Sequence, residues 1–394
     1  MRRISANYIF PVTNSPLKNG IIEVDDSGSI LNIIDTQGHL TESRNLEFYN
    51  GVIVPGFINA HCHLELSELK GKFNQGLTIP GFINLIIGYK NNIDSEKVIS
   101  AARLHDGLMK QNGIVAVADI VNNPLTIEIK KKSKIYYHNF IELIGLGSNA
   151  NEIFNKNILL YNEFINSGLK ASIVPHAPYS VSENLFELLV QFATENNSIL
   201  SVHNQESESE NEMFRTKKGK LIDLFTSIGI NLSDWKPSGK NSMDFLMKKF
   251  PKENNILFVH NLYSTKNEIA SVASEFNNSY FVLCPLSNFF IESRYPDVDN
   301  FLPFSEKMTI GTDSLASNNS LSILEEMKVL AKLGSTLAFE TILKWGTING
   351  ARALKLEEKL GSIEIGKIPG LNLITDFDFT NMQIADKSNV SVLV

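Results

Sequence analysis

The sequence is poor in cysteine and has no long apolar run. Its 394 residues include two cysteines, Cys62 and Cys284, which are too few for a disulfide scaffold and favour a reducing compartment. The first residues, MRRISANYIFPV, lack the apolar stretch of a signal peptide, and no segment approaches the length of a membrane span. The sequence therefore predicts a cytoplasmic protein with no membrane partner.

Long blocks of like charge are also missing. The 43 acidic and 36 basic residues are interspersed and leave a net charge of −7, which argues against a nucleic-acid or anionic-membrane partner. The one cluster of like charge, interpreted as a solvated helix end, comprises Lys130, Lys131, Lys132 and Lys134. We expect a soluble protein that acts on a small-molecule substrate, and the sequence leaves a homodimer open.

Short β-branched runs alternate with amphipathic stretches from about residue 52 to residue 350. This alternation is typical of βα units and a parallel sheet. The pattern predicts an α/β fold with a closed (β/α)8 barrel, whose candidate strands lie near 52–60, 113–121, 134–145, 170–176, 199–204, 255–260, 280–284 and 308–313. Helices are expected over 95–113, with Gly113 as a cap, and over 182–197.

Both ends of the chain differ from this middle. Residues 1–51 contain alternating, turn-rich segments, with a hairpin turn expected at 25–28, and residues 360–394 have the same character. Neither end is long enough to hold a core alone. We expect 1–51 plus 360–394 to form a small sheet domain beside a barrel domain of residues 52–359.

Two histidines, His61 and His63, end the apolar run VIVPGFINAHCH. Because side chains alternate along a strand, residues i and i+2 point the same way and can hold one ion from one side. An isolated pair of this kind is also typical of a solvated loop. Here other ligand-type residues close strand-like runs of their own, namely His176, His203, His260 and Asp313. Barrel enzymes keep their chemistry at these strand ends.

Imidazoles and a carboxylate suit Zn²⁺ best, with Fe²⁺ as a competitor that the ligand types do not exclude. An ion held with an open position lowers the pKa of a bound water toward neutrality and so generates hydroxide. Glu206, three residues after His203, is the candidate to manage protons. Its alternative is an exposed acid in the run ESESENE.

Three further strand-end residues have alternatives of their own. His260 is a fourth ligand or a group that orients the water, unless it is a satisfied core histidine. Asp313 can ligate the ion and accept a proton; its alternative is a helix N-cap, although Asn319 or Ser320 is better placed for that. His176, held extended between prolines, can reach the substrate.

Weaker candidates for substrate contact are Glu65, Asn288, Arg215 and Trp235, whereas Trp345 is expected in the core. Arg215 and Trp235 belong to the long segment between the fifth and sixth strands, and loops at a barrel mouth decide specificity. If the substrate carries a distal carboxylate, Arg215 is a candidate to pair with it. The alternative is an ordinary surface arginine.

Motifs along nearly the whole chain resemble the amidohydrolase superfamily, and most of all its branch of cytosine, guanine and adenosylhomocysteine deaminases and triazine chlorohydrolases. In chain order they are PGFINAHCHLELS, HAPYSVS, SVHNQES, FVHN, CPLSN, GTDSLASNNSLSILEEM, WGTINGARAL and GSIEIGKIPGLNLI. The resemblance implies a distorted (β/α)8 TIM barrel with a β-sandwich built from both termini.

The resemblance also implies roles for the residues. The metal ligands become His61, His63, His203 and Asp313. Glu206 then shuttles protons, His260 holds the nucleophilic water, and Asp313 accepts the proton of that water. His176 matches a histidine that lies against the substrate in nucleoside-deaminating relatives. Binuclear relatives use a carboxylated lysine near the end of the fourth strand; here no lysine follows Lys170 in it, which implies a mononuclear site.

Two departures concern Pro369–Gly370, where relatives have Ala-Asp, and HLELS, which is closer to relatives acting on aminodeoxyfutalosine. The leading expectation is a metal-dependent hydrolytic deaminase of an aminated purine nucleoside or related N-heterocycle, of the adenosylhomocysteine, methylthioadenosine or aminodeoxyfutalosine type. The alternatives are a chlorohydrolase-type hydrolase and a catalytically inactive barrel scaffold. Glu206 favours deamination, because ammonia must be protonated to leave and chloride need not be.

Overall fold

The computed structural model describes residues 1–41, 45–90, 92–147, 149–233, 235–334 and 337–394. The strands are β1 (Arg2–Ile9), β2 (Leu17–Lys18), β3 (Ile21–Val24), β4 (Ile30–Ile34), β5 (Leu46–Pro55), β6 (Phe57–Cys62), β7 (Ile114–Val121), β8 (Tyr136–Leu143), β9 (Lys170–Pro175), β10 (Leu200–Asn204), β11 (Ile256–His260), β12 (Ser279–Leu283), β13 (Met308–Ile310), β14 (Leu371–Thr375) and β15 (Asn389–Val392).

The α-helices are α1 (Thr78–Lys90), α2 (Ser95–Gln111), α3 (Ile127–Lys132), α4 (Ala150–Asn166), α5 (Glu183–Glu195), α6 (Glu208–Thr216), α7 (Lys220–Ser227), α8 (Ser242–Lys249), α9 (Lys266–Glu275), α10 (Pro285–Glu292), α11 (Ile323–Leu333), α12 (Phe339–Trp345) and α13 (Ile348–Ala353). Short 3-10 helices are η1 (Leu64–Leu69), η2 (Val298–Asn300) and η3 (Leu302–Lys307). Within the described ranges, none of the helices is both long and apolar enough to cross a membrane.

The described central strands form two four-stranded parallel sheets, ordered β6-β7-β8-β9 and β10-β11-β12-β13. The sheets meet along both edges. The backbone N–H of His203 donates to the carbonyl of His176 at 2.9 Å, and a parallel bridge pairs Cys62 with Asp313. The chain therefore has the predicted α/β alternation, with strand ends from both sheets gathered at one place.

The first predicted strand, 52–60, is wrong as a single element. Val52–Pro55 is the end of β5 in the terminal sheet, and β6 begins after Gly56. A Cβ atom at Gly56 would lie 2.3 Å from a methyl group of Val115, and its N–H donates to the carbonyl of Pro369 at 3.1 Å. The glycine lets two buried strands follow one another in one apolar run, so the run alone does not show the break.

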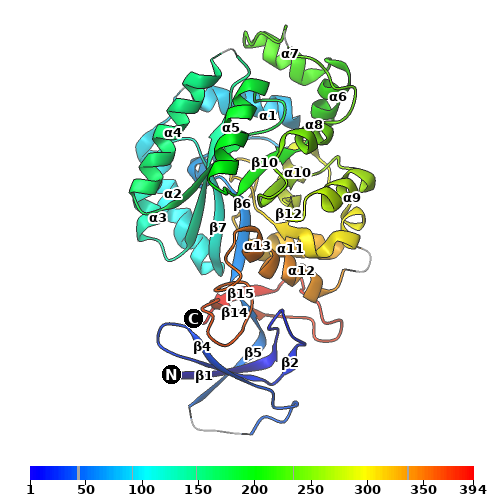
Figure 1. The fold of residues 1–394 in the computed structure, drawn as a ribbon. Helices are drawn as coiled ribbons and strands as arrows, with labels where there is room; N and C mark the ends of the chain where they lie inside the picture. Colours follow the sequence, from blue (N-terminus) through cyan, green and yellow to red (C-terminus); the bar gives the residue numbers. More distant parts are fainter. Residues whose placement is uncertain (42–44, 91, 148, 234, 335–336) are drawn as a thin grey trace.

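The two chain ends pair as expected. β14 runs antiparallel to β5, and the described strands of the terminal sheet follow the order β15-β14-β5-β1-β3-β4, with β2 on β1. The implied β-sandwich takes the form of one continuous mixed sheet, because β1 and β5 are parallel and bridge the two ends. This sheet lies at one end of the central strands, and α1, α6 and α7 lie at the other (Figure 1). The division at residues 51 and 360 stays a prediction.

The structure confirms the turn predicted at residues 25–28 but not the predicted N-cap of α11. The β3–β4 turn closes where predicted, because Asp25 Oδ1 accepts the Ser27 N–H and Gly28 has φ +85°. The cap of α11 is Ser322, whose hydroxyl accepts the Glu325 N–H, and not Asn319 or Ser320. Those two residues are held in the preceding turn, where both of their N–H groups donate to Asn318 Oδ1.

The interpretation of the lysine cluster as a solvated helix end is wrong for Lys130. Its side chain is fully buried and forms an ion pair with the equally buried Asp119 of β7. The ammonium also donates to Asn139 Oδ1 at 2.6 Å and lies 5.2 Å from the ring centroid of Tyr137. The neighbouring Lys131 is exposed. A charge cluster in sequence does not show which member turns inward.

We expect Lys130→Met to lower the free energy of unfolding by about 3 kcal/mol, since it leaves the buried Asp119 carboxylate without a counter-charge. Urea unfolding measures the change. Lys131→Met on the same helix is the control and should alter stability by less than about 0.5 kcal/mol. Equal effects from the two substitutions would show that the buried pair is not stabilising.

Candidate metal centre

Four side chains from three strand ends converge on one point. His61 Nε2 lies 3.1 Å from His63 Nε2, which lies 3.3 Å from His203 Nε2. Asp313 Oδ1 lies 3.6 Å from His61 Nε2 and 3.4 Å from His63 Nε2. Ligands about 2.0–2.1 Å from a tetrahedral zinc ion stand about 3.3 Å apart. The donor set and its spacing therefore fit a single transition-metal ion.

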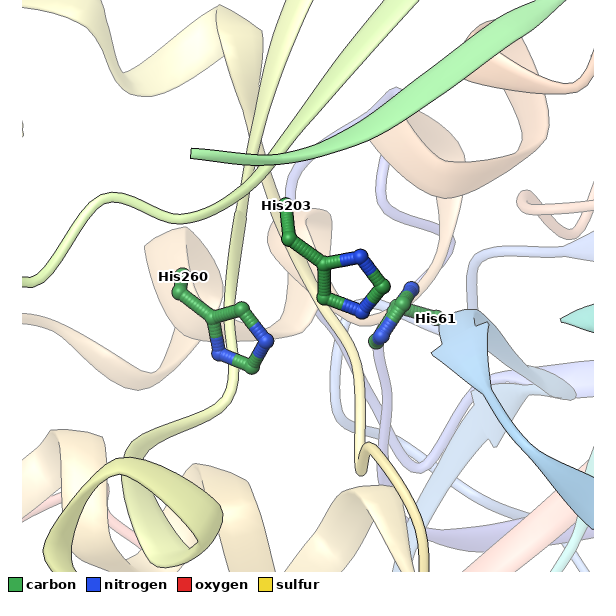
Figure 2. A group of neighbouring side chains, drawn as sticks. All are labelled: His61, His203 and His260. Atoms are coloured by element: carbon green, nitrogen blue, oxygen red, sulfur yellow. The ribbon is translucent and has the colours of Figure 1, made fainter. Parts of the chain in front are cut away.

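Backbone geometry at the strand ends brings these groups together. Figure 2 shows the rings of His61, His203 and His260 pointing toward one another. His260 and Asp313 both have left-handed backbone conformations, with φ of +72° and +56°. Such conformations are costly for residues other than glycine and cluster at functional sites. At these two ends the chain leaves the sheet sharply and aims a side chain inward.

Neighbouring groups fix which atoms of the ligands face the centre. His203 Nδ1 lies 2.7 Å from the carbonyl oxygen of His176. A carbonyl only accepts, so this nitrogen carries the proton and Nε2 offers its lone pair. Asp313 Oδ2 accepts hydroxyl protons from Ser287 at 2.6 Å and Ser317 at 2.8 Å, which leaves Oδ1 toward the histidines.

The two serines were not singled out from the sequence, although both lie in the motifs CPLSN and GTDSLASNNS. We expect the double substitution Ser287→Ala and Ser317→Ala to weaken metal affinity or activity by about 10- to 100-fold, the usual effect of losing groups that orient ligands. Competition with a coloured chelator measures the affinity. Ser320→Ala, in the same loop, is the control. An unchanged affinity in the double variant would mean that Asp313 needs no such support.

Glu206 and His260 form a second pair beside this centre. Glu206 Oε1 lies 3.4 Å from His260 Nε2, and both side chains are buried. Glu206 is therefore not the exposed acid of the run ESESENE. Its burial, reinforced by the charge of Asp313, raises the pKa of the carboxyl well above its usual range. A carboxyl that holds its proton can donate it.

Asn288 contacts His260, not the cavity. Its amide nitrogen lies 3.1 Å from His260 Nδ1. Donation by this amide makes Nδ1 an acceptor and places the ring proton on Nε2, on the side of Glu206. The imidazole then presents an N–H group toward the centre.

A cavity of about 310 Å³ opens directly beside these groups, and its lining includes His63, His203, Glu206, His260 and Asp313. This volume is in the range of small-molecule sites. Two further predicted contacts, His176 and Glu65, also line it. Glu142, Asn122 and Lys90 line it as well and were not anticipated, although Glu142 lies near the end of a predicted strand, as the ligands do.

Arg215 and Trp235 do not line the cavity. Arg215 is exposed and pairs with Glu208 and with Asn241 Oδ1, and Trp235 packs edge-on against Phe214. Their predicted contact with substrate has no support in this geometry. Trp345 is buried in the core, as expected.

Imidazole and carboxylate groups at the ends of parallel strands, beside a cavity and a buried acid, are the groups expected of a metal-binding hydrolase on an α/β fold. The model for the Amidohydrolase family matches residues 52–393, and the chain belongs to this family. The resemblance read from the motifs is thereby confirmed.

Three relatives show how close the likeness is. An aminodeoxyfutalosine deaminase of Nitratiruptor sp. is 29% identical over 82% of this chain and 79% of its own length. The crystal structure of Helicobacter pylori aminofutalosine deaminase in complex with methylthio-coformycin has a TM-score of 0.83 and 25% identity, and the match covers 96% of this chain and 93% of that one. An adenosine deaminase structure from Xanthomonas campestris with bound zinc has a TM-score of 0.73 and 22% identity, over 98% and 86% of the two chains, and shows the shared fold.

Proposed function

We propose that this protein is a hydrolytic deaminase of adenine nucleosides that uses one divalent transition-metal ion. Zinc is the ion we expect. The observation that carries the proposal is the convergence of three imidazole nitrogens and one carboxylate oxygen beside the Glu206–His260 pair. His63 Nε2 lies 3.1–3.4 Å from the other three atoms, and Asp313 Oδ1 lies 3.6 Å from His61 Nε2. The likeness to deaminases of adenine-type nucleosides supports the substrate class. In this proposal the two central sheets act as one closed, distorted (β/α)8 barrel.

The residues that would hold the ion are His61, His63, His203 and Asp313. When bound, the ion supplies a water whose pKa is low enough to give hydroxide near neutral pH. With the ion in place, the Nε2–H group of His260 would donate a hydrogen bond to that water, and the Asp313 carboxylate would accept the proton that the water loses.

Glu206 acts on the nucleoside substrate. Deamination adds hydroxyl to the ring carbon and needs a proton on the neighbouring ring nitrogen, which the buried Glu206 carboxyl can give. The carboxylate left behind then receives the proton held by Asp313 and passes it to the amino group. The carbon–nitrogen bond then breaks and ammonia leaves. The added hydroxyl gives its remaining proton to the Glu206 carboxylate, which restores the acid, and the ring keeps a carbonyl in place of its amine.

Ammonia release from a panel of substrates tests the proposal. Adenosine, 5′-deoxyadenosine, 5′-methylthioadenosine, aminodeoxyfutalosine, guanine and cytosine are incubated with zinc-loaded protein, together with a chlorinated triazine. We expect ammonia, and a carbonyl-bearing product in equal amount, from at least one adenine nucleoside. Release of chloride alone would assign the chain to the chlorohydrolases, and no product from any compound would support an inactive scaffold.

A further inference from the structure

The cavity beside the proposed metal ligands has a polar and an apolar part. Its polar lining includes histidines, Asp313 and Glu206, and its apolar lining comes mainly from three segments: helix α1, Ile144 and Leu146 after β8, and Phe225, Ile228 and Ile230 in and after α7. Helix α1 presents one face to the cavity, at the helical spacing of i, i+3, i+4 and i+7, with Ile79, Phe82, Ile83 and Ile86. These side chains offer an apolar surface within reach of a nucleoside bound in the same cavity.

Two apolar residues of this lining are exposed to solvent. Ile144 follows β8 and is 45% exposed, and Ile228 follows α7 and is 38% exposed; both line the cavity. Exposed apolar side chains gathered at the edge of a cavity are typical of a ligand-binding surface. An apolar group of a ligand that covered them would remove this surface from water.

The cavity offers no free cation for an acidic tail. Among the described residues that line it, Lys90 is the one lysine or arginine. Its ammonium donates to Asn122 Oδ1 at 3.0 Å, and Asn122 in turn donates to Glu65 Oε2 at 3.0 Å and to Glu142 Oε2 at 3.1 Å. Lys90 therefore belongs to a hydrogen-bonded group that already contains two carboxyls, and Arg215 is paired outside the cavity.

We propose that the cavity selects adenine nucleosides that carry a short, uncharged, apolar group at the 5′ position, of the alkylthio or deoxy kind, over those with an amino-acid or carboxylate tail. This inference rests on the proposed deaminase function. Its physical reason is that the apolar part of the lining is favourable for methyl and methylene groups, whereas an ammonium or carboxylate placed against these side chains loses hydration without gaining a partner from them.

A matched pair of substrates isolates the charge of the tail. 5′-Propylthioadenosine is adenosylhomocysteine without its ammonium and carboxylate groups, so the two differ in charge but share the carbon chain. We expect kcat/KM for ammonia release to be at least about tenfold higher for the propylthio compound. From methylthio to propylthio, each added methylene that is buried should raise kcat/KM by about fourfold.

Substitutions on helix α1 test whether the apolar lining of the cavity causes the preference for the uncharged tail. Ile83→Lys puts a cation on the cavity face and should narrow the preference for the propylthio compound over adenosylhomocysteine. Leu85→Lys, on the outer face of the same helix, is the control and should leave the preference within about twofold of wild type. Ile83→Ala introduces no charge; it should lower kcat/KM for the propylthio compound about fivefold more than kcat/KM for adenosine.

The outcomes separate the inference from the function on which it rests. Adenosylhomocysteine turned over as well as or better than the propylthio compound overturns the inference and leaves the deaminase standing. A preference unchanged by both Ile83 variants also overturns it. No ammonia from any adenine nucleoside overturns the deaminase and the inference together.

Discussion

Asp313→Asn is expected to lower kcat/KM for deamination by at least about a thousandfold, because it removes a metal ligand and a proton acceptor in one change. The buried carboxylate has one oxygen toward the histidines and the other held by two serine hydroxyls. An amide in its place carries no charge and cannot take the proton of the water. Steady-state ammonia release with zinc in excess measures the loss.

The fold should survive this substitution, and circular dichroism is the check. Asp297→Asn, at an exposed position, is the control and should behave as wild type. If the Asp313→Asn variant retained a tenth or more of wild-type activity in saturating zinc, Asp313 would be removed from the proton path.

Glu206→Gln is the second substitution with a large expected effect, a loss of at least about a hundredfold in turnover. The glutamine keeps the size of the side chain but has no proton to give to the ring nitrogen. Because Glu206 lies beside the proposed ligands without belonging to them, the variant should keep both its fold and its bound metal. Ammonia release and metal content are measured on the same sample.

Glu208→Gln is the matched control, since Glu208 belongs to the same acidic run but is exposed and paired with Arg215. It should turn over at the wild-type rate. Near-normal turnover by the Glu206 variant would show that Glu206 does not transfer protons in the reaction.

The sequence predicts the strand ends well because the signal is local. Each proposed ligand directly follows or ends a short apolar run, and period-two alternation alone places His61 and His63 on the same side. The structure brings both to the point where His203 and Asp313 also arrive. The order of the strands within each central sheet follows from the alternation of strands and helices along the chain. The ends of the chain pair because neither can form a core alone.

What the sequence could not predict depends on partners far away in the chain. The burial of Lys130 depends on Asp119 on a strand beside its helix, and that partner is invisible in a run of lysines. Arg215 lies in a segment whose path no periodicity fixes, and the structure turns it outward to Glu208. The apolar lining of the cavity likewise comes mainly from three segments that meet only in the folded chain.

Titration of metal-free protein with zinc, followed by ammonia release from 5′-methylthioadenosine, tests the central claim most directly. The protein is stripped with a chelator, checked for its fold, and given increasing zinc. With four converging ligand atoms and one acid, Glu206, we expect no activity without metal. The rate of ammonia release should rise linearly with added zinc and stop rising at about one zinc ion per chain. Full activity in the stripped protein, or a rise that continues to two ions per chain, would contradict a deaminase with a single metal ion.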